Sequence, residues 1–518
     1  MHNPRKFSLK KLFHLLTSRI FIVIVLIMVQ LAIFVLSLTS LGRDFAFLKY
    51  VFKAVSFLCL LKIINSNDNP AYKIPWIILI IVMSPIGGLI YLLFGTKSMP
   101  SYLDGRTDAV FEKTKDKLNK SLPLFEKLEQ DDKSISKQVA YIENRSFYPV
   151  YQNTQTRYYP LGEEMFEAML NALRGAKHFI FMEYFIVDTG IMWDQIREIL
   201  VEKAKEGVDV RLLYDDLGCI MTLPSNFAKN LRKDGVKVYA FNPVHAKLDV
   251  KMNSRDHRKI LVVDGHIGFT GGVNIADEYI NAYEKHGHWK DGGVMLQGEA
   301  VWNLTVMFLQ FWHYADKSTE DFSKFAPDVY GPAYQSDGYV QPYADSPLDD
   351  EILGEQVYLN VISNAKDYVY INTPYLIIDN EMTTALTLAA KSGIDVRITT
   401  PHIPDKWYVH LVTRSYYHQL IKAGVKVYEY LPGFIHAKSF VSDDTVGVIG
   451  TTNLDFRSLY LHYECGVWMY KSSAVLQLKQ DYLDTLEKCK QITLEECMAI
   501  PKTKRFIAAT LRLLSPLM

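Results

Sequence analysis

His257-Arg-Lys-Ile-Leu-Val-Val-Asp264 is the stretch of this 518-residue chain that decides its fold. The same spacing returns in His436-Ala-Lys-Ser-Phe-Val-Ser-Asp443. Both runs are apolar after the lysine, and both are followed by a small-residue turn that ends in asparagine, at Gly271-Gly-Val-Asn274 and Gly450-Thr-Thr-Asn453. A set of residues repeated at one register indicates a repeated structural unit. We therefore expect two equivalent halves within one chain.

The repeated histidine and lysine have the chemistry of a phosphodiester site. Residues two apart on a strand face the same side, so His257 should project with Lys259, and His436 with Lys438. The ammonium can hold the non-bridging oxygens while the imidazole attacks phosphorus or carries the proton of the leaving group. The repeat therefore predicts one phosphate site with two imidazoles.

Two more residue types belong to the repeat. Asn274 and Asn453 follow the turns, and we expect their amides to donate to the same phosphate oxygens. Asp264 and Asp443 lie an odd number of residues from their histidines, so on a regular strand they face away from them. We expect these two carboxylates to support the site rather than to react.

The composition excludes several functional classes. Lysine and arginine balance aspartate and glutamate at a formal net charge of +0, so no overall basic field favours nucleic acid. The 5 cysteines are scattered, which argues against a disulfide framework. Neither cysteines nor histidines have the spacing of a structural zinc site, and we expect chemistry without a metal or another cofactor.

The N-terminal region is apolar enough for a membrane. Residues 20–41 form an uncharged run long enough to cross a bilayer; a signal peptide is the alternative, but the run is too long for a typical one. Residues 74–94 form a second run with Pro85, Gly87 and Gly88, which predicts a kinked spanning helix. Residues 45–64 carry three lysines, so an interfacial or re-entrant helix fits them better.

Charge places both ends of this region on the same side. The basic N-terminus and the lysine-rich segment after Phe94 both favour the cytoplasm, and two spans satisfy both ends. Three spans would put the catalytic region outside, an alternative that the sequence leaves open.

The rest of the chain alternates strands and helices in the manner of an α/β domain. After the membrane region, 1–96, we expect a connector at 97–150, a first half at 151–316, a polar linker at 317–338 and a second half at 339–500. The basic and apolar segment 501–518 is either a membrane-surface helix or a helix docked on the catalytic region.

The two His-x-Lys-x4-Asp sets resemble the HKD motifs of the phospholipase D superfamily. Further segments, among them Met182-Glu-Tyr-Phe185, Trp289-Lys-Asp291 and Gly450-Thr-Thr-Asn-Leu-Asp-Phe-Arg-Ser458, resemble the bacterial cardiolipin synthases nearly end to end. The resemblance implies two phospholipase D-like halves that form one pseudo-twofold catalytic unit behind N-terminal transmembrane helices. The catalytic set that it implies is His257, Lys259, Asp264, His436, Lys438 and Asp443.

The same resemblance implies a reaction. One phosphatidylglycerol would give its phosphatidyl group to a histidine, and a second would accept it, yielding cardiolipin and glycerol. The resemblance favours His257 as the nucleophile and places Asp291 and Glu464 where the superfamily keeps a carboxylate against each histidine. One departure from the internal repeat is that Glu183 aligns with Asn372.

Partners and location follow from the implied reaction. Phosphatidylglycerol and other membrane lipids would be the partners, without nucleic acid, in a multi-pass protein of the bacterial cell membrane. A membrane-bound phospholipase D-type hydrolase and another phosphatidyltransferase remain as alternatives. A non-catalytic membrane scaffold is disfavoured because both histidine-lysine pairs are intact.

Overall fold

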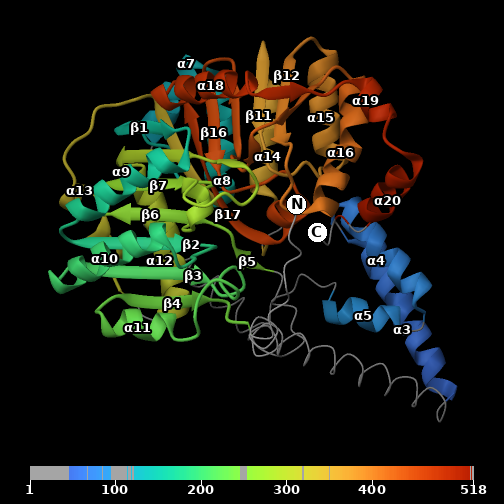
Figure 1. The fold of residues 1–518 in the computed structure, drawn as a ribbon, viewed down its shortest axis with the longest axis horizontal. Coiled ribbons are helices and arrows are strands. Elements are labelled where there is room, and N and C mark those ends of the chain that lie inside the picture. Colours follow the sequence, from blue (N-terminus) through green and yellow to red (C-terminus); the bar gives the residue numbers. More distant parts are fainter. Residues whose placement is uncertain are drawn as a thin grey trace, which may run out of the picture. The chain divides into compact units, whose positions relative to one another are not determined.

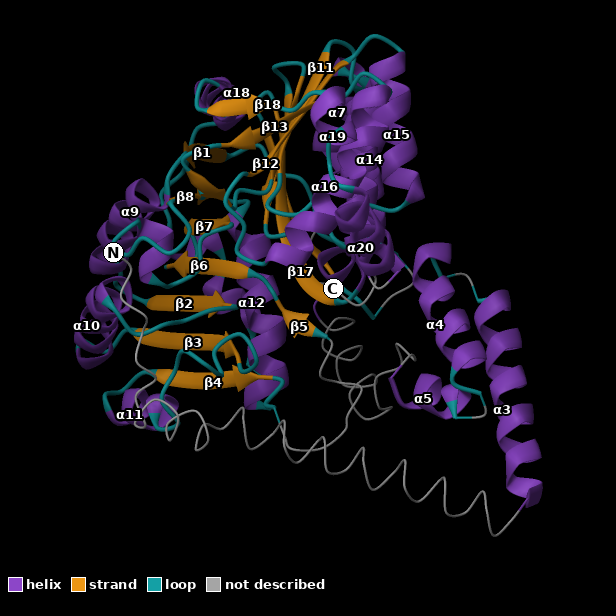
Figure 2. Ribbon diagram, turned by 45° about the vertical axis from the view of Figure 1, so that its right-hand side comes forward, coloured by secondary structure: helices purple, strands orange, loops and turns teal. Residues whose placement is uncertain are grey.

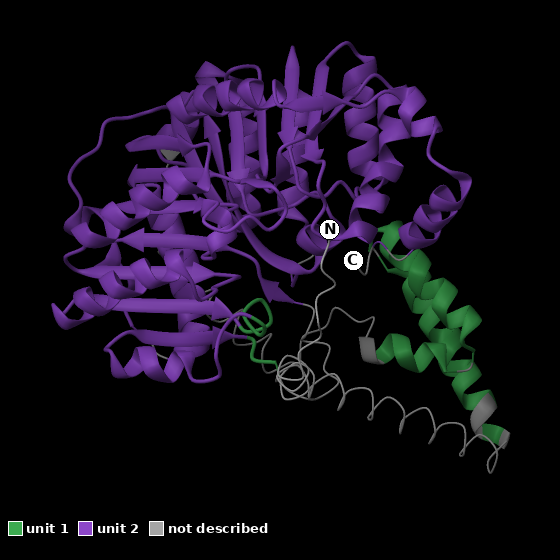
Figure 3. Ribbon diagram, viewed as in Figure 1, with its two compact units in different colours: residues 1–99, 216–221, 242–253 green, residues 100–215, 222–241, 254–518 purple. Residues whose placement is uncertain are grey.

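The computed structural model of the chain describes residues 46–66, 68–84, 86–94, 114, 118, 122–244, 254–317, 320–348, 351–513 and 515. The chain divides into two units (Figure 3). The first comprises residues 1–99, 216–221 and 242–253, and the second comprises 100–215, 222–241 and 254–518. The predicted span at residues 20–41 lies outside the described residues.

The described residues of the first unit form three helices: α3 (Ala46–Asn65), α4 (Pro70–Val82) and α5 (Gly87–Phe94). They pack around a core of Cys59, Ile63, Tyr72, Trp76, Ile80 and Tyr91. Helix α5 can approach α3 closely because Gly88 has no side chain: a Cβ there would stand 2.5 Å from the Cα of Ser56. The serine hydroxyl accepts a hydrogen bond from the N–H of Gly88 at 3.2 Å.

The prediction of one kinked helix across residues 74–94 is wrong. Helix α4 ends at Val82, and α5 begins at Gly87 and contacts both α3 and α4. No described helix is both long enough and apolar enough to cross a membrane. The expected helix at 45–64 is present as α3, with its three lysines.

The first half of the second unit is built on a seven-stranded sheet in the order β1-β9-β7-β6-β2-β3-β4 (Figure 1). Its strands are β1 (Thr154–Tyr159), β2 (Phe179–Tyr184), β3 (Asp209–Asp215), β4 (Lys237–Phe241), β6 (Lys259–Val263), β7 (Ile267–Gly271) and β9 (Gly293–Gly298). The helices between them are α9 (Gly162–Gly175), α10 (Ile191–Lys205) and α11 (Phe227–Lys233), and α12 (Val301–Asp316) follows β9. Strands β2, β3 and β4 run parallel, as expected for βαβ units.

The second half repeats this order as β10-β17-β16-β15-β11-β12-β13, with β18 added at the edge. Its strands are β10 (Tyr339–Asp345), β11 (Tyr368–Asn372), β12 (Asp395–Pro401), β13 (Lys426–Tyr430), β15 (Ser439–Ser442), β16 (Val446–Gly450), β17 (His462–Tyr470) and β18 (Cys489–Gln491). Its helices are α14 (Leu353–Asn364), α15 (Asn380–Lys391), α16 (Trp407–Lys422), α17 (Phe456–Tyr460) and α18 (Ser473–Leu486). The predicted α/β duplication is confirmed.

Helices cover both sheets. In Figure 2, α9 and α10 lie on one side of the first sheet and α12 on the other, and α14, α15 and α16 line the outer side of the second sheet. Helix α12 also contacts β10 of the other half, and α18 contacts β1. The last helix of each half therefore helps to join the two halves.

Short strands cross between the halves. Strand β5 (Arg255–Asp256), just before His257, pairs with the start of β17. Strand β14 (Gly433–Ile435), just before His436, pairs with β8 (His288–Lys290). Each histidine is thus carried to the boundary by a strand that hydrogen-bonds to the opposite half.

The connector and the C-terminus both pack on the second half. Helices α7 (Leu122–Asp131) and α8 (Lys133–Ser146) occupy the described end of the connector, and α8 contacts α14 and β10. Helices α19 (Leu494–Met498) and α20 (Lys502–Leu513) both contact α16. Helix α20 buries Ala508, but Phe506 is 74% exposed, so it is docked and yet presents an apolar surface.

Candidate active site

A cavity of about 570 Å³ opens where the two halves meet. Its lining includes His257, Asn274 and Trp289 of the first half and His436 and Asn453 of the second. Both predicted histidines therefore face one cavity. This volume is that of a site for a drug-sized ligand or a lipid head group.

His257 is held by a carboxylate of the other half. Its Nδ1 lies 2.9 Å from Oε1 and 3.0 Å from Oε2 of Glu464, which is fully buried on β17. The backbone N–H of His257 donates to the carbonyl of Tyr463 at 2.9 Å. Because the carboxylate accepts from Nδ1–H, Nε2 is left as the basic nitrogen of a neutral imidazole.

His436 has the reciprocal arrangement. Its Nδ1 lies 2.6 Å from Oδ2 of Asp291, a fully buried carboxylate of the first half, and its backbone N–H donates to the carbonyl of Lys290 at 2.7 Å. Asp291 and Glu464 thus each contact one of the two histidines, as the family resemblance implied, but the resemblance did not say which acid contacts which histidine. The exchange means that neither half holds a complete histidine-carboxylate pair.

The two lysines lie beside their histidines as the i, i+2 spacing predicts. Lys259 donates to the carbonyl of His257 at 2.5 Å, and Lys438 lies 2.9 Å from Nε2 of His436. Burial lowers the pKa of Lys259 to about 8 and that of Lys438 to about 7. Their charge is held in a dry site, where an anion would be attracted strongly.

Both imidazoles are neutral in the free cleft at neutral pH. Burial, followed by the charges of Lys259 and Lys438, holds the pKa of His257 well below its usual range. Burial and Lys438 lower the pKa of His436 to about 4, against the opposing effect of Asp291. A neutral imidazole is the form that can act as a nucleophile.

The two aspartates of the motifs lie away from the cavity lining. The Asp264 carboxylate accepts hydrogen bonds from the backbone N–H groups of Lys177, His178 and Phe179, each at 2.8 Å. Asp443 accepts from the equivalent N–H groups at residues 366, 367 and 368. Each aspartate therefore holds in place the backbone at the start of the central strand of its half. This geometry fits a supporting role.

The expected role of Asn274 in binding phosphate stays a prediction, because its amide lines the cavity but already has two protein partners. Its Oδ1 accepts from the N–H of Ile186 at 3.0 Å, and its Nδ2 donates to the Tyr279 hydroxyl at 2.8 Å. These contacts brace the cavity wall and occupy the Oδ1 acceptor and one of the two Nδ2 hydrogens, so the other hydrogen can still donate to a phosphate. Asn453 differs from it, since its Oδ1 is buried without a hydrogen-bond partner and the residue lines the cavity.

The sequence did not single out His462, whose imidazole also lines the cleft beside His257. The ring of His462 lies 5.5 Å from that of His257, and Trp289 lies 5.4 Å from His436. His462 and Trp289 occupy equivalent positions in the repeat, two residues before Glu464 and Asp291. The repeat register could have found them, because each stands on the strand that pairs with the opposite half.

The surroundings of the two histidines therefore differ. His436 is bordered by the rings of Trp289, Tyr279 and Phe434, whereas His257 is bordered by Phe185 and His462. Nitrogen and oxygen atoms of His257, His462 and Glu464 lie within 4.8 Å of one another, a spacing that an ion could bridge. The expectation of metal-free chemistry thus stays a prediction.

The unduplicated acid at Glu183 has a structural partner. Its Oε1 lies 2.6 Å from the Arg258 guanidinium, and Arg258 also donates to Asp256 at 3.2 Å. The same guanidinium lies 3.7 Å from the centre of the Phe311 ring. In the second half Ala437 replaces the arginine, and Asn372 donates to Ser439, so this buried ionic cluster belongs to the first half alone.

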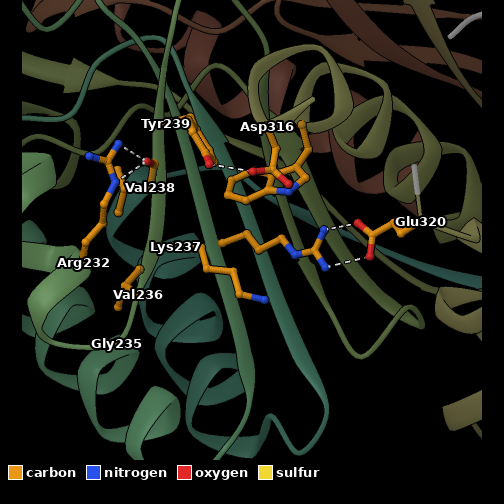
Figure 4. Close-up of a pocket in the computed structure, with 10 residues that line it drawn as sticks. Arg232, Gly235, Val236, Lys237, Val238, Tyr239, Asp316 and Glu320 are labelled. Atoms are coloured by element: carbon orange, nitrogen blue, oxygen red, sulfur yellow. Dashed lines mark hydrogen bonds and ion pairs between the residues drawn. The ribbon is translucent and has the colours of Figure 1, made fainter. Parts of the chain in front are cut away.

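A second cavity, of about 450 Å³, lies beside β4 and α12 in the first half (Figure 4). Its charges are paired: Arg211 binds Glu320 and Asp209, and Lys237 donates to Asp209 at 2.8 Å. Arg232 donates to the carbonyl of Val238. This cavity therefore offers no cation for a substrate phosphate.

Comparison with known proteins agrees with this geometry. The family model described as "Cardiolipin synthase, PLD-like domain" matches residues 169–286 and 358–486, and a "Phospholipase D-nuclease N-terminal" model matches 54–95. A cardiolipin synthase of Alkalihalophilus pseudofirmus is 36% identical over 457 residues, covering 87% of this chain and 90% of that protein. The chain belongs to the cardiolipin synthase family.

Other relatives support the same family. Cardiolipin synthase 2 of Bacillus cereus is 35% identical over 471 residues, covering 90% of this chain and 91% of its own. An uncharacterised protein of Streptococcus mutans is 40% identical over 465 residues, covering 88% of this chain and 99% of that protein. The sequence-based resemblance to the cardiolipin synthases is confirmed.

A solved structure supports the fold. Phosphatidylserine synthase of Haemophilus influenzae superposes with a TM-score of 0.57 at 14% identity, covering 73% of this chain and 97% of that chain. The fold of this cardiolipin synthase family member is therefore similar to that of this solved structure.

Proposed function

We propose that this chain is a phosphatidyltransferase that makes cardiolipin and glycerol from two molecules of phosphatidylglycerol. The observation that carries the proposal is the reciprocal exchange of carboxylates, by which Glu464 orients His257 and Asp291 orients His436 in one cavity. Two imidazoles on opposite sides of one phosphate are what an in-line double displacement needs.

The first step forms a covalent intermediate. Nε2 of one histidine, which we assign to His257, attacks phosphorus, and the bond from phosphorus to the glycerol oxygen breaks. The bound phosphate anion raises the pKa of His436, which takes up a proton from solvent as the substrate binds. The glycerol oxygen takes that proton from His436 as its bond to phosphorus breaks. Lys259 and Lys438 hold the non-bridging oxygens throughout.

The second step reverses the roles. The hydroxyl of another phosphatidylglycerol gives its proton to His436, now neutral, as its oxygen attacks the phosphohistidine. The nitrogen-phosphorus bond breaks, cardiolipin leaves, and both histidines return to their starting states. Water in place of that hydroxyl would give phosphatidic acid instead.

The proposed organisation follows the expected boundaries. Residues 1–96 would hold the chain at the cell membrane with the catalytic halves, 151–316 and 339–500, on the cytoplasmic side. The match of residues 54–95 to a phospholipase D-type N-terminal model supports membrane association. The lipid substrates of the family supply the reason for it.

Purified full-length enzyme with headgroup-labelled and acyl-labelled phosphatidylglycerol tests the reaction. We expect cardiolipin and one free glycerol for each cardiolipin formed. His257→Ala and His436→Ala should each abolish turnover, and acid-quenched enzyme should retain acyl label in at most one of them. Phosphatidic acid as the main product, or label on serine or lysine, would overturn the proposal.

A further inference from the structure

Large apolar side chains are exposed at the mouth of the catalytic cavity. Lys285 and His286 of the loop before β8, and Lys406 at the start of α16, line the cavity. Beside them Tyr283 is 58% exposed and Trp407 67% exposed. Single exposed apolar residues are common, but these two lie within two positions in the sequence of residues that line the cavity.

The exposed residues come from both halves and meet at that opening. The loop that carries Tyr283 belongs to the first half, whereas Ile403 and Trp407 belong to the second. The two segments touch: a Cβ at Gly287 would stand 3.1 Å from Cδ1 of Ile403, which is itself 36% exposed. We call Tyr283, Ile403, Trp407, Lys285 and Lys406 the rim.

The cavity is too small for whole substrates. Its volume of about 570 Å³ suits one drug-sized ligand, whereas the reaction proposed above joins two diacyl lipids. Phosphate and glycerol can enter it, but the acyl chains of both lipids must remain outside. Whatever covers the rim during turnover must therefore accommodate hydrocarbon chains.

We propose that the rim sits in the head-group layer of the bilayer that supplies the lipids. This inference rests on the proposed function, because it takes phospholipids as the substrates. Tryptophan and tyrosine favour the depth of the head groups, where the ring is buried and its polar atom stays hydrated. Lys285 and Lys406 are 45% and 52% exposed and lie 2.6 Å from Glu278 and 3.8 Å from Asp405, so a lipid phosphate would compete with these carboxylates for them.

A nitroxide label tests the contact without depending on catalysis. Full-length chains whose native cysteines are replaced by alanine would carry Trp407→Cys, Tyr283→Cys or, as a matched control, Leu388→Cys on α15, where Leu388 is 63% exposed. In phosphatidylglycerol vesicles we expect labels at 407 and 283 to collide with oxygen more than with a water-soluble nickel complex. The label at 388 should show the reverse.

Kinetics test the consequence for the reaction. Trp407→Ser should lower the rate on vesicle-embedded phosphatidylglycerol by about tenfold but change the rate on dispersed short-chain phosphatidylglycerol by less than about twofold. Leu388→Ser should change neither rate. Equal loss on both substrates would mean that Trp407 acts inside the cavity, and no loss on vesicles would mean that the rim does not face lipid.

Two further results would overturn the proposal. Dipolar coupling between labels at 407 would show that a second copy of the chain covers the rim. Water-exposed labels at both 407 and 283 would show that nothing covers it. If the labels were exposed to lipid but the enzyme formed no cardiolipin, the result would contradict the proposed function and still support the membrane contact.

Discussion

Each of the two histidines that we propose to be catalytic is oriented by a side chain from the opposite half. Glu464→Gln removes the acceptor that keeps the Nδ1 proton of His257 in place, and Asp291→Asn does the same for His436. We expect each change to lower kcat by about two to four orders of magnitude, with a small effect on KM, as for carboxylates that orient catalytic histidines elsewhere.

A matched control separates this loss from general damage to a buried site. Glu355→Gln changes another buried carboxyl, whose pKa burial raises to about 9, so the side chain is already protonated at neutral pH. That variant should keep full activity. A wild-type kcat in Glu464→Gln, or an equal loss in Glu355→Gln, would contradict the assigned role.

The lysine pKa values predict the pH profile. Burial lowers the pKa values of Lys438 and Lys259 to about 7 and about 8, so in the free enzyme the phosphate-binding charge is present below these values and is lost above them. We expect kcat/KM to fall as pH rises through this range. At the acidic end it should fall only where the nucleophile His257 becomes protonated, and burial holds the pKa of that imidazole well below its usual range. Lys438→Arg should move the basic limb to higher pH, because a guanidinium stays charged.

A bound phosphate anion stabilises the protonated form of both lysines and so raises their pKa values. The basic limb of kcat should therefore lie at higher pH than that of kcat/KM. Rates measured from pH 4 to 10 with dispersed short-chain substrate would separate the two profiles. A basic limb in kcat/KM that stays where it is in Lys438→Arg would exclude Lys438 as its source.

We predict that the two lysines neutralise the phosphate charge without a divalent metal. We expect enzyme treated with a chelator, and assayed in its presence, to retain its activity. The test matters because His257, His462 and Glu464 are close enough to bridge an ion. Complete loss of activity that only one metal restores would contradict the prediction.

Individual residue roles could be predicted from the sequence only where the repeat constrains them. The i, i+2 spacing placed both lysines beside their histidines. The spacing could not reveal that the Asn274 amide donates a hydrogen bond to the Tyr279 hydroxyl. That contact depends on how a short 3-10 turn packs against the strand ends. The positions of Asp291 and Glu464 came from family resemblance, since no local pattern links them to residues 145 and 207 positions away.

At the scale of elements, the motif aspartates stabilise the central strands. Asp264 has φ 48°, a left-handed conformation that aspartate and asparagine tolerate better than alanine. Asp264→Ala would also leave three backbone N–H groups without their acceptor. We expect it to lower the free energy of unfolding by about 2–4 kcal/mol, and Asp264→Asn to lower it by less.

Thermal unfolding in detergent micelles would rank these variants, and kcat would be measured on the folded fraction at low temperature. Since Asp264 is at the far end of β6 from His257, that kcat should stay close to the wild-type value. A large loss of kcat in a stably folded Asp264→Asn enzyme would instead give this aspartate a role in the reaction.

The elements were predicted well where their pattern is local. Alternating strands and helices indicated the βαβ units, and both halves have them in the same order. The break between α4 and α5 was not predicted, because an apolar run has the same composition whether it continues or folds back. The two-residue β5 and the three-residue β14 were also missed, since strands this short have no periodicity.

At the scale of the whole molecule, one chain contains both halves of one site. Strands β5 and β17 pair across the boundary, as do β14 and β8, and each histidine takes its carboxylate from the other side. The halves are therefore not two separate active sites. A chain that lacks either histidine should have no working site at all.

This arrangement predicts the result of mixing inactive chains. Co-expressed His257→Ala and His436→Ala chains should not regain activity, because each folded chain pairs its own β5 with its own β17 and so keeps one defective histidine. Co-expressed wild type and His257→Ala should give activity in proportion to the amount of wild-type chain. This control tests whether the variant chain inhibits the wild-type chain. Cardiolipin formation by the mixed variants, measured in purified membranes, would mean that the halves exchange between two chains and that the functional site is assembled in a dimer.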